Sequence, residues 1–168
     1  MEPRIEFIKE KMLVGQHQRM SLLANTTVAL WQRFMQRQKA QPFSRSAERY
    51  SVQVYEADYF HPFRPEATFE KWAAVEATQP GTAPTDLKML LLPAGLYAVF
   101  RHYGPASAGP AMFRYILTVW LPSSAYVLDD RPHFEVLGEL YKNEDPTSEE
   151  DIWIPVKPRL SELAESGA

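Results

Sequence analysis

The two halves of this 168-residue chain repeat one order of predicted elements, which restricts the folds open to it. In each half, an extended segment precedes a helix and two strands. Three pairs of landmarks keep an offset of 82 or 83 residues: Asn25 and Ser107 at the helix caps, Tyr50 and His133 at the first strands, Phe69 and Asp151 at the last strands. Neither half can bury much apolar surface alone, so the two should pack into one body.

The spacing of apolar residues predicts where these elements lie. Residues 4–20 form one or two extended segments around Gly15, and a helix runs from Thr27 to just before Pro42. The first half then has strands over 50–55 and 69–77. The second half has a strand over 95–104, a helix from the Ser107 cap to Pro122, and strands over 133–141 and 151–157. A proline within the last strand, Pro155, favours an edge position for it.

These elements predict an α+β fold of two fused β-α-β-β units, related by a pseudo-two-fold axis and built on antiparallel sheets. We expect a single domain over residues 1–160, with one repeat over about 3–80 and the other over about 86–158. Residues 161–168 are mostly small and polar and should form a flexible tail. The alternative is a generic α+β domain in which the matching offsets are a coincidence.

Composition excludes several classes of function. The chain has no cysteine, which excludes disulfides, thiolate metal sites and cysteine nucleophiles. A net charge of -3 provides no general basic field for nucleic-acid phosphates. The first residues are charged throughout, and no apolar run approaches the ~18–20 residues that span a bilayer. We therefore expect a soluble cytoplasmic protein that does not act at a membrane.

Six segments taken in order resemble the GyrI-like small-molecule-binding family over about residues 3–158: IEFIKEKMLVG, YSVQVY, FEKWAAVE, LPAGLYAVFRHYG, WLPSSAYVLDDRPHFEVLG and EEDIWIPVK. This family forms the effector-binding domain of many bacterial transcription activators and also occurs as a stand-alone protein. The resemblance implies two fused β-α-β-β units with a ligand groove between them, and ligands that are amphipathic and often cationic. No helix-turn-helix fits before residue 3, so we expect a stand-alone protein without direct DNA binding.

The resemblance singles out Glu135, because the family carries one acidic residue on the first strand after the second helix. Strand alternation places His133, Glu135, Leu137 and Glu139 on one face and Phe134, Val136 and Leu140 on the other. We expect the second set to pack under the helices, so that Glu135 faces the groove as a counter-charge for cations. The alternative is an exposed glutamate without a role.

Aromatic side chains are the expected companions of this carboxylate, because their faces attract organic cations. The candidate ligand-binding residues besides Glu135 are Tyr97, Tyr50, Trp72, Trp31 and Trp153. By resemblance, Tyr50 and Tyr97 line the pocket and Trp31 closes it from the first helix. Trp72 and Trp153 occupy nearly corresponding places in the two repeats, so we expect them to form opposite walls. The alternative for each ring is plain core packing.

Other chemistry finds little support in the sequence. The four histidines lack metal-ligand spacing, and no nucleophile elbow or glycine-rich phosphate loop occurs, so we expect no metal and no cofactor. Residues 129–151 carry nine Asp or Glu against two Lys or Arg, for a net charge of -7. Such a segment is either solvated surface or a docking site for a basic partner.

Three functions follow from these observations. The first is a stand-alone protein that senses or sequesters amphipathic, cationic small molecules through Glu135. The second is a hydrolase that uses Glu135 as its catalytic residue on reactive cyclopropane-bearing toxins, an activity known for some stand-alone family members. The third is a protein-interaction role, such as gyrase inhibition, through the acidic segment 129–151.

Overall fold

Strands and two helical segments make up the part of the chain that the computed structural model describes, namely residues 1–40, 44, 46–78 and 83–160. The first half contains β1 (Arg4–Ile8), β2 (Lys11–Ser21), α1 (Thr27–Ala40), β3 (Arg49–Val54) and β4 (Thr68–Glu76). The second contains β5 (Lys88–Leu92), β6 (Gly95–Tyr103), α2 (Gly109–Tyr115), β7 (Tyr126–Leu128), β8 (His133–Leu137) and β9 (Glu149–Pro158). The predicted tail, 161–168, lies outside the described residues.

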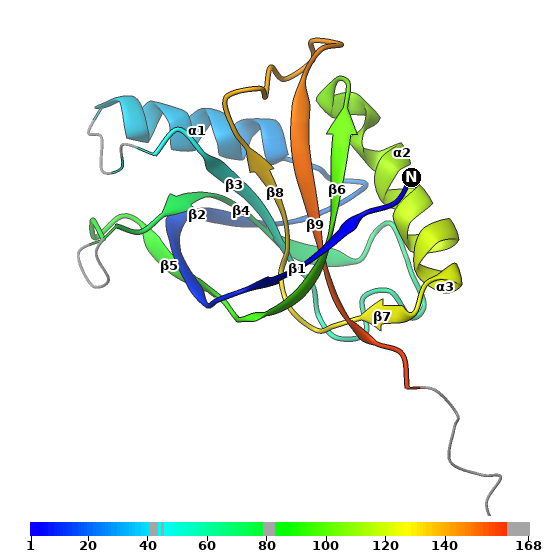
Figure 1. Cartoon of the computed structure of the whole chain (residues 1–168). Helices are drawn as coiled ribbons and strands as arrows, with labels where there is room; N and C mark the ends of the chain where they lie inside the picture. The colour runs from blue at the N-terminus through cyan, green and yellow to red at the C-terminus, as the bar shows by residue number, and fades with distance from the viewer. Residues whose placement is uncertain (41–43, 45, 79–82, 161–168) are drawn as a thin grey trace, which may run out of the picture.

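All the strands join one antiparallel sheet, which confirms an α+β fold with a large antiparallel sheet and two helices. The strand order is β1-β6-β9-β8-β3-β4-β2-β5, and the short β7 pairs with β9. The central pair, β3 and β8, comes from different halves of the chain. Figure 1 shows α1 beside the strands of the first half and α2 beside those of the second.

The two ends of this sheet are tied together by chain continuity. β1 runs into β2 through residues 9 and 10, and β5 runs into β6 through residues 93 and 94. The β1–β6 ladder, from Arg4↔Val99 to Ile8↔Gly95, keeps the same register as the β2–β5 ladder. The sheet therefore curls, and the break in the first extended segment falls at residues 9–10 rather than around Gly15.

The curled sheet has a helix-covered face and a helix-free face, each with apolar packing. On the covered face, α1 packs Leu30 and Phe34 against β2 and β4, while the second helical segment packs Ile116 and Trp120 against β6 and β9. On the free face, a third cluster joins side chains from β2, β3, β4, β5, β6 and β8. Both helices cover one face, because cross-strand pairs place their side chains on the same side of a sheet.

The prediction that Phe134, Val136 and Leu140 pack under the helices is wrong. Phe134 lies opposite Val52, and both belong to the helix-free cluster, with Val136 packed against it. Leu140 follows the end of β8 and is exposed. Alternation identifies which residues share a face of a strand, but the packing of the whole sheet decides which face the helices cover.

The edge position predicted for the last strand is also wrong, because β9 lies between β6 and β8. Pro155 pairs with Tyr97 on one side, and its carbonyl accepts a hydrogen bond from the Asp129 amide on the other (3.0 Å). On that second side, the β8 ladder stops at Trp153 and the β7 ladder starts at Val156. The missing N–H of Pro155 therefore falls between two ladders and leaves no strand unpaired.

The observed start of α1 agrees with the sequence-based prediction, whereas the observed start of the second helical segment does not. The α1 helix starts at Thr27 as predicted: the Thr26 carbonyl accepts the first helical hydrogen bond from the Leu30 amide (3.1 Å), and Asn25 Oδ1 accepts one from the Thr27 amide (3.0 Å). The second segment begins with a 3₁₀ turn over Ala106–Ala108 and has no side-chain cap, so the cap predicted at Ser107 is wrong. It continues beyond α2 as a π-helical turn, Ile116–Trp120, and a short α3, Leu121–Ser123.

The backbone of β2 at Gly15 lies very close to β4. Adding even one methyl group at this position is therefore expected to destabilise the fold. A Cβ atom at Gly15 would overlap the Ala73 carbonyl oxygen and lie 2.7 Å from the Cα atom of Ala74. Gly15→Ala should lower the free energy of unfolding by about 1–3 kcal/mol in urea denaturation. Gly109→Ala is the matched control, because nothing lies within 4 Å of its added methyl group. Equal stability of the two variants would contradict this account of the strand contact.

Candidate functional site

Four buried polar residues occupy the centre of the helix-covered face, where β3 pairs with β8. Ser51 lies opposite Glu135, and Gln53 lies opposite His133. Each is at most 9% exposed. We call these four residues the polar strip. Because the apolar clusters under α1 and α2 lie on the strands to either side of β3 and β8, the strip runs between the two helix-backed cores.

Glu135 is held by Gln53 within this strip. The Gln53 Nε2 atom donates to both carboxylate oxygens of Glu135, at 3.2 and 3.0 Å. The two residues are 82 positions apart, which is the offset of the sequence repeat, so each half contributes the corresponding position. The Gln53 Oε1 atom is buried without a hydrogen-bond partner among the described residues. The strip therefore presents an anion and an unpaired carbonyl oxygen side by side.

Lys71 supplies the positive charge closest to Glu135. It lies on β4 opposite Gln53, and its Nζ atom is 4.0 Å from Glu135 Oε2. The side chains of Lys71 and Glu135 are 9% and 11% exposed. A buried charge without a partner is costly, so the pair offsets two desolvation penalties. At 4.0 Å this contact is an ion pair without a hydrogen bond.

Glu150 adds a second carboxyl group from β9. It alternates with Ile152 and Ile154, both packed under α2, so it points to the helix-covered face. Burial, reinforced by the negative charge of Glu135 and opposed by Lys71, raises the pKa of Glu150 to about 7. Near neutral pH this group is therefore poised between its protonated and ionised forms.

An aromatic cluster borders the His133 end of the strip. It consists of rings from the segment after β3 and from the start of β4: Tyr55, Tyr59, Phe60, Phe63 and Phe69. The Tyr55 ring lies edge-on to His133 with centroids 5.0 Å apart, and burial together with the charge of Glu135 raises the pKa of the Tyr55 phenol. Phe63 is 52% exposed. The cluster thus extends from the buried strip to the protein surface.

His133 is a neutral member of the strip. Burial, with a smaller contribution from Arg131, lowers its pKa to about 3. Its ring packs between Tyr55 and Phe60, with centroid distances of 5.0 and 5.7 Å. It therefore acts here as an aromatic wall rather than as a cation.

The lowered pKa of His133 predicts an acid-sensitive fold. An unfolded histidine takes up a proton near pH 6.5, whereas the folded protein resists this until about pH 3. The stabilisation is complete above pH 6.5 and is lost as the pH falls, by on the order of a few kcal/mol. In urea denaturation between pH 7 and pH 4, His133→Phe should lose less stability than the wild type. Parallel pH profiles for the two proteins would argue against this burial effect.

The structure does not bring most of the predicted aromatic residues together with Glu135. Tyr50, Tyr97 and Trp72 belong to the helix-free cluster, and Trp153 packs against it. There Trp153 stacks on Phe134, with ring centroids 5.3 Å apart. Strand alternation places this cluster on the face opposite to the polar strip.

Trp31 is the exception among these rings. Arg33 and Arg37 of α1 reach Gln16 and Asp86, at the β2–β5 end of the sheet. Helical spacing places Trp31 on the opposite flank of α1, toward β3. Its described contacts are with the cluster under α1, including Phe34 at a ring-centroid distance of 5.7 Å, and its place beside Glu135 stays a prediction.

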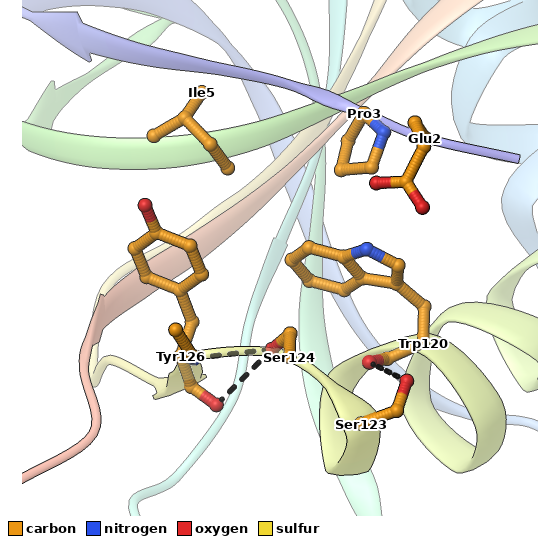
Figure 2. Close-up of a pocket in the computed structure, with 8 residues that line it drawn as sticks. Glu2, Pro3, Ile5, Trp120, Ser123, Ser124 and Tyr126 are labelled. Carbon is orange, nitrogen blue, oxygen red and sulfur yellow. Dashed lines mark hydrogen bonds between the residues drawn. The ribbon is translucent and has the colours of Figure 1, made fainter. Parts of the chain in front are cut away.

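A cavity of about 250 Å³ lies elsewhere, between the N-terminal segment and the end of the second helical segment. Figure 2 shows the Trp120 and Tyr126 rings below Pro3 and Ile5. The hydroxyl groups of Ser123 and Ser124, which also line the cavity, donate to backbone carbonyls of the helix. None of the lining residues belongs to the polar strip.

The acidic segment 129–151 is partly neutralised by internal ion pairs. Asp151 contacts Arg4 and Arg101, each at 2.8 Å, and Glu149 lies 3.3 Å from Arg101. Within the described residues, no three His, Asp or Glu side chains are placed to hold a metal ion. None of the described helices has the length and apolar character needed to cross a bilayer. A docking role for the acidic segment stays a prediction.

Sequence reasoning missed Lys71, Glu150 and the aromatic segment 55–63. On its face of β4, Lys71 lies between the buried residues Phe69 and Ala73, and on its face of β9, Glu150 precedes the buried residues Ile152 and Ile154. A charge on the buried face of a strand is the signal that could have identified them. The run YEADYFHPF has four aromatic residues in nine positions, a density that indicates packing rather than an exposed loop.

Comparison with known proteins supports one family. The sequence pattern of the GyrI-like small molecule binding domain matches residues 1–157. No curated protein matches the chain significantly. Three solved structures share the fold. SAV2435 bound to tetraphenylphosphonium is 18% identical, with a TM-score of 0.69 and 94% of each chain covered. The EcmrR C-terminal domain is 13% identical (TM-score 0.65; 94% of this chain and 98% of that one). A hydrolase from Listeria innocua is 11% identical (TM-score 0.56; 93% and 92%).

Proposed function

The chain belongs to the GyrI-like small molecule binding domain family, and from this premise we propose that it binds amphipathic organic cations at the polar strip, between its two halves. Glu135 acts as the counter-charge. The aromatic cluster and Trp31 form the walls, and binding serves to sense or sequester the ligand. The helix-free rings Tyr50, Tyr97, Trp72 and Trp153 are left out of the proposed site, because they pack on the other face of the sheet.

The observation that carries this proposal is the environment of Glu135. Its carboxylate is buried, accepts two hydrogen bonds from one amide, and lies next to an unpaired carbonyl oxygen. A negative charge in a poorly hydrated site attracts a bulky cation strongly, because the cation loses little hydration when it enters. The neighbouring rings add favourable contact with a cationic or aromatic ligand. SAV2435, which has the same fold, was solved with such a cation bound.

Titration calorimetry with two ions of matched shape tests the proposal. Tetraphenylphosphonium and tetraphenylborate have the same four-phenyl framework and opposite charges. We expect saturable binding of the phosphonium and much weaker binding of the borate. Equal affinity for both ions would show that shape alone governs binding, and absence of phosphonium binding would contradict the proposal.

A second candidate function, hydrolysis at the same site, is favoured by Glu150. A hydrolase needs a group that exchanges a proton near working pH, and burial raises the pKa of Glu150 to about 7 beside Glu135. In this alternative, Glu135 positions or activates water, and Glu150 donates a proton to the leaving group of a strained, cyclopropane-bearing electrophile. Product formation followed by mass spectrometry tests it, and steady turnover that is lost in Glu150→Gln would favour the hydrolase.

A further inference from the structure

Lys71 occupies the position where a cationic ligand is proposed to bind. Among the described residues its ammonium makes no hydrogen bond, and its one ion pair is with Glu135 at 4.0 Å. Gln53 in contrast is bonded directly to both oxygens of the same carboxylate. Gln53 is therefore the fixed partner of Glu135, whereas Lys71 is a charge on a flexible four-carbon stem.

A cation that approaches Glu135 meets this ammonium as a competitor. Two positive charges that share one buried carboxylate repel each other, and the repulsion is strong where water is scarce. The ligand therefore has to move the ammonium away, and the ammonium in turn needs another negative partner.

Glu150 offers that second partner. It points to the same face of the sheet, and the charge of Lys71 already acts on its carboxyl group, in opposition to that of Glu135. The ammonium of Lys71 lies 4.0 Å from Glu135, and Glu150 lies on the adjacent strand, two positions from Ile152, which is the residue opposite Glu135. Movement of the ammonium from Glu135 toward Glu150 keeps every buried charge paired.

We propose that Lys71 is an internal counter-ion that occupies the cation site of the free protein and is displaced toward Glu150 when a ligand binds. Lys71 then determines specificity: only ligands that interact with Glu135 better than a tethered ammonium does can enter. This inference rests on the proposed function and deepens it, because it names what the ligand replaces.

Calorimetry at pH 8 with tetraphenylphosphonium and tetraphenylborate tests the displacement. Lys71→Met keeps most of the length of the side chain and removes its charge, so it should bind the phosphonium about tenfold tighter or more, equivalent to about 1.4 kcal/mol. Lys9→Met is the matched control. It removes one positive charge from the exposed turn between β1 and β2 and should bind like the wild type.

Two further variants keep the test decisive if Lys71→Met folds poorly. Lys71→Gln should also tighten phosphonium binding, whereas Lys71→Arg keeps the charge and should bind no tighter than the wild type. In Glu135→Gln the ammonium of Lys71 is left unpaired, so that variant should shift its preference toward the borate. The double variant Lys71→Met/Glu135→Gln carries neither charge, so its affinities for the phosphonium and the borate should differ least.

The outcomes separate this inference from the function on which it rests. If the wild type binds the phosphonium and neither Lys71→Met nor Lys71→Gln binds it more tightly, the internal counter-ion is refuted and the cation site stands. If the wild type fails to bind the phosphonium and both uncharged variants bind it, Lys71 occupies the site without being displaced, which refutes both the displacement and the proposed function. If no variant binds either ion, the proposed function and the inference fall together.

Discussion

Glu135→Gln should weaken tetraphenylphosphonium binding by about 2–3 kcal/mol, roughly 30- to 150-fold. Two effects combine in this variant. The ligand loses its counter-charge, and Lys71, 4.0 Å from the Glu135 carboxylate, becomes an uncompensated buried ammonium that repels the ligand. A neutral ligand of related shape, triphenylphosphine oxide, needs no counter-charge and is not repelled by the ammonium. It should therefore bind with nearly unchanged affinity. Calorimetric titration of both ligands measures the difference.

Glu139→Gln is the matched control for this change. It makes the same chemical replacement on the exposed segment directly after β8, outside the polar strip. It should bind both ligands like the wild type. If Glu135→Gln weakens the neutral ligand as much as the cation, Glu135 shapes the site instead of supplying charge, and the proposed role of its carboxylate is wrong.

The affinity for the same cation should rise about tenfold as the pH increases through 7. Burial raises the pKa of Glu150 to about 7, so its carboxyl group changes from neutral to anionic in this range. A bound cation favours the anionic form, and by linkage the anionic form binds the cation more tightly. Calorimetry between pH 5.5 and 8.5 should show this rise, and Glu150→Gln should abolish it.

The other titratable neighbours of Glu150 have to be distinguished from it in such a pH profile. His133 stays neutral because its pKa is lowered to about 3 by burial, and burial raises the pKa of both Tyr55 and Tyr141. His102 pairs with Glu150 in the β6–β9 ladder and is also buried, so His102→Gln is measured beside Glu150→Gln. Lys71, Glu135 and Glu150 are the other charged or titrating groups of the described site. A pH profile that persists unchanged in Glu150→Gln would assign the titration to another group.

Most elements of this fold could be predicted from local patterns. Leu30 and Phe34 recur at helical spacing and define the buried side of α1, and the Asn25 cap places its start. The strand predicted over residues 95–104 is observed as Gly95–Tyr103. These features depend on residues that are close together in the chain, so the periodicity of apolar side chains predicts them directly.

The candidate site was harder to predict from the sequence than the fold, because its residues come from separate strands. Glu135 was identified by family resemblance together with its apolar surroundings. Lys71 lies in a strand that is buried on both faces, and only the β3–β4 register places it opposite Gln53. Tyr50 and Tyr97 looked like suitable walls for a pocket, but the curled sheet packs them on its other face. A strand pattern does not state which of its two faces a helix will cover.

The sequence by itself determined most of the elements, though not β5 or β7, together with their approximate ends and an offset of 82 or 83 residues between the two halves. It did so because hydrophobic period, caps and turn residues are local properties of the chain. The tertiary structure alone decided that β3 and β8 pair at the centre of the sheet and that both helices cover the face of Glu135. It also placed Lys71 and Glu150 beside that carboxylate. Contacts between strands that are distant in the chain depend on how the whole sheet curls and buries its apolar surface, which no single segment encodes.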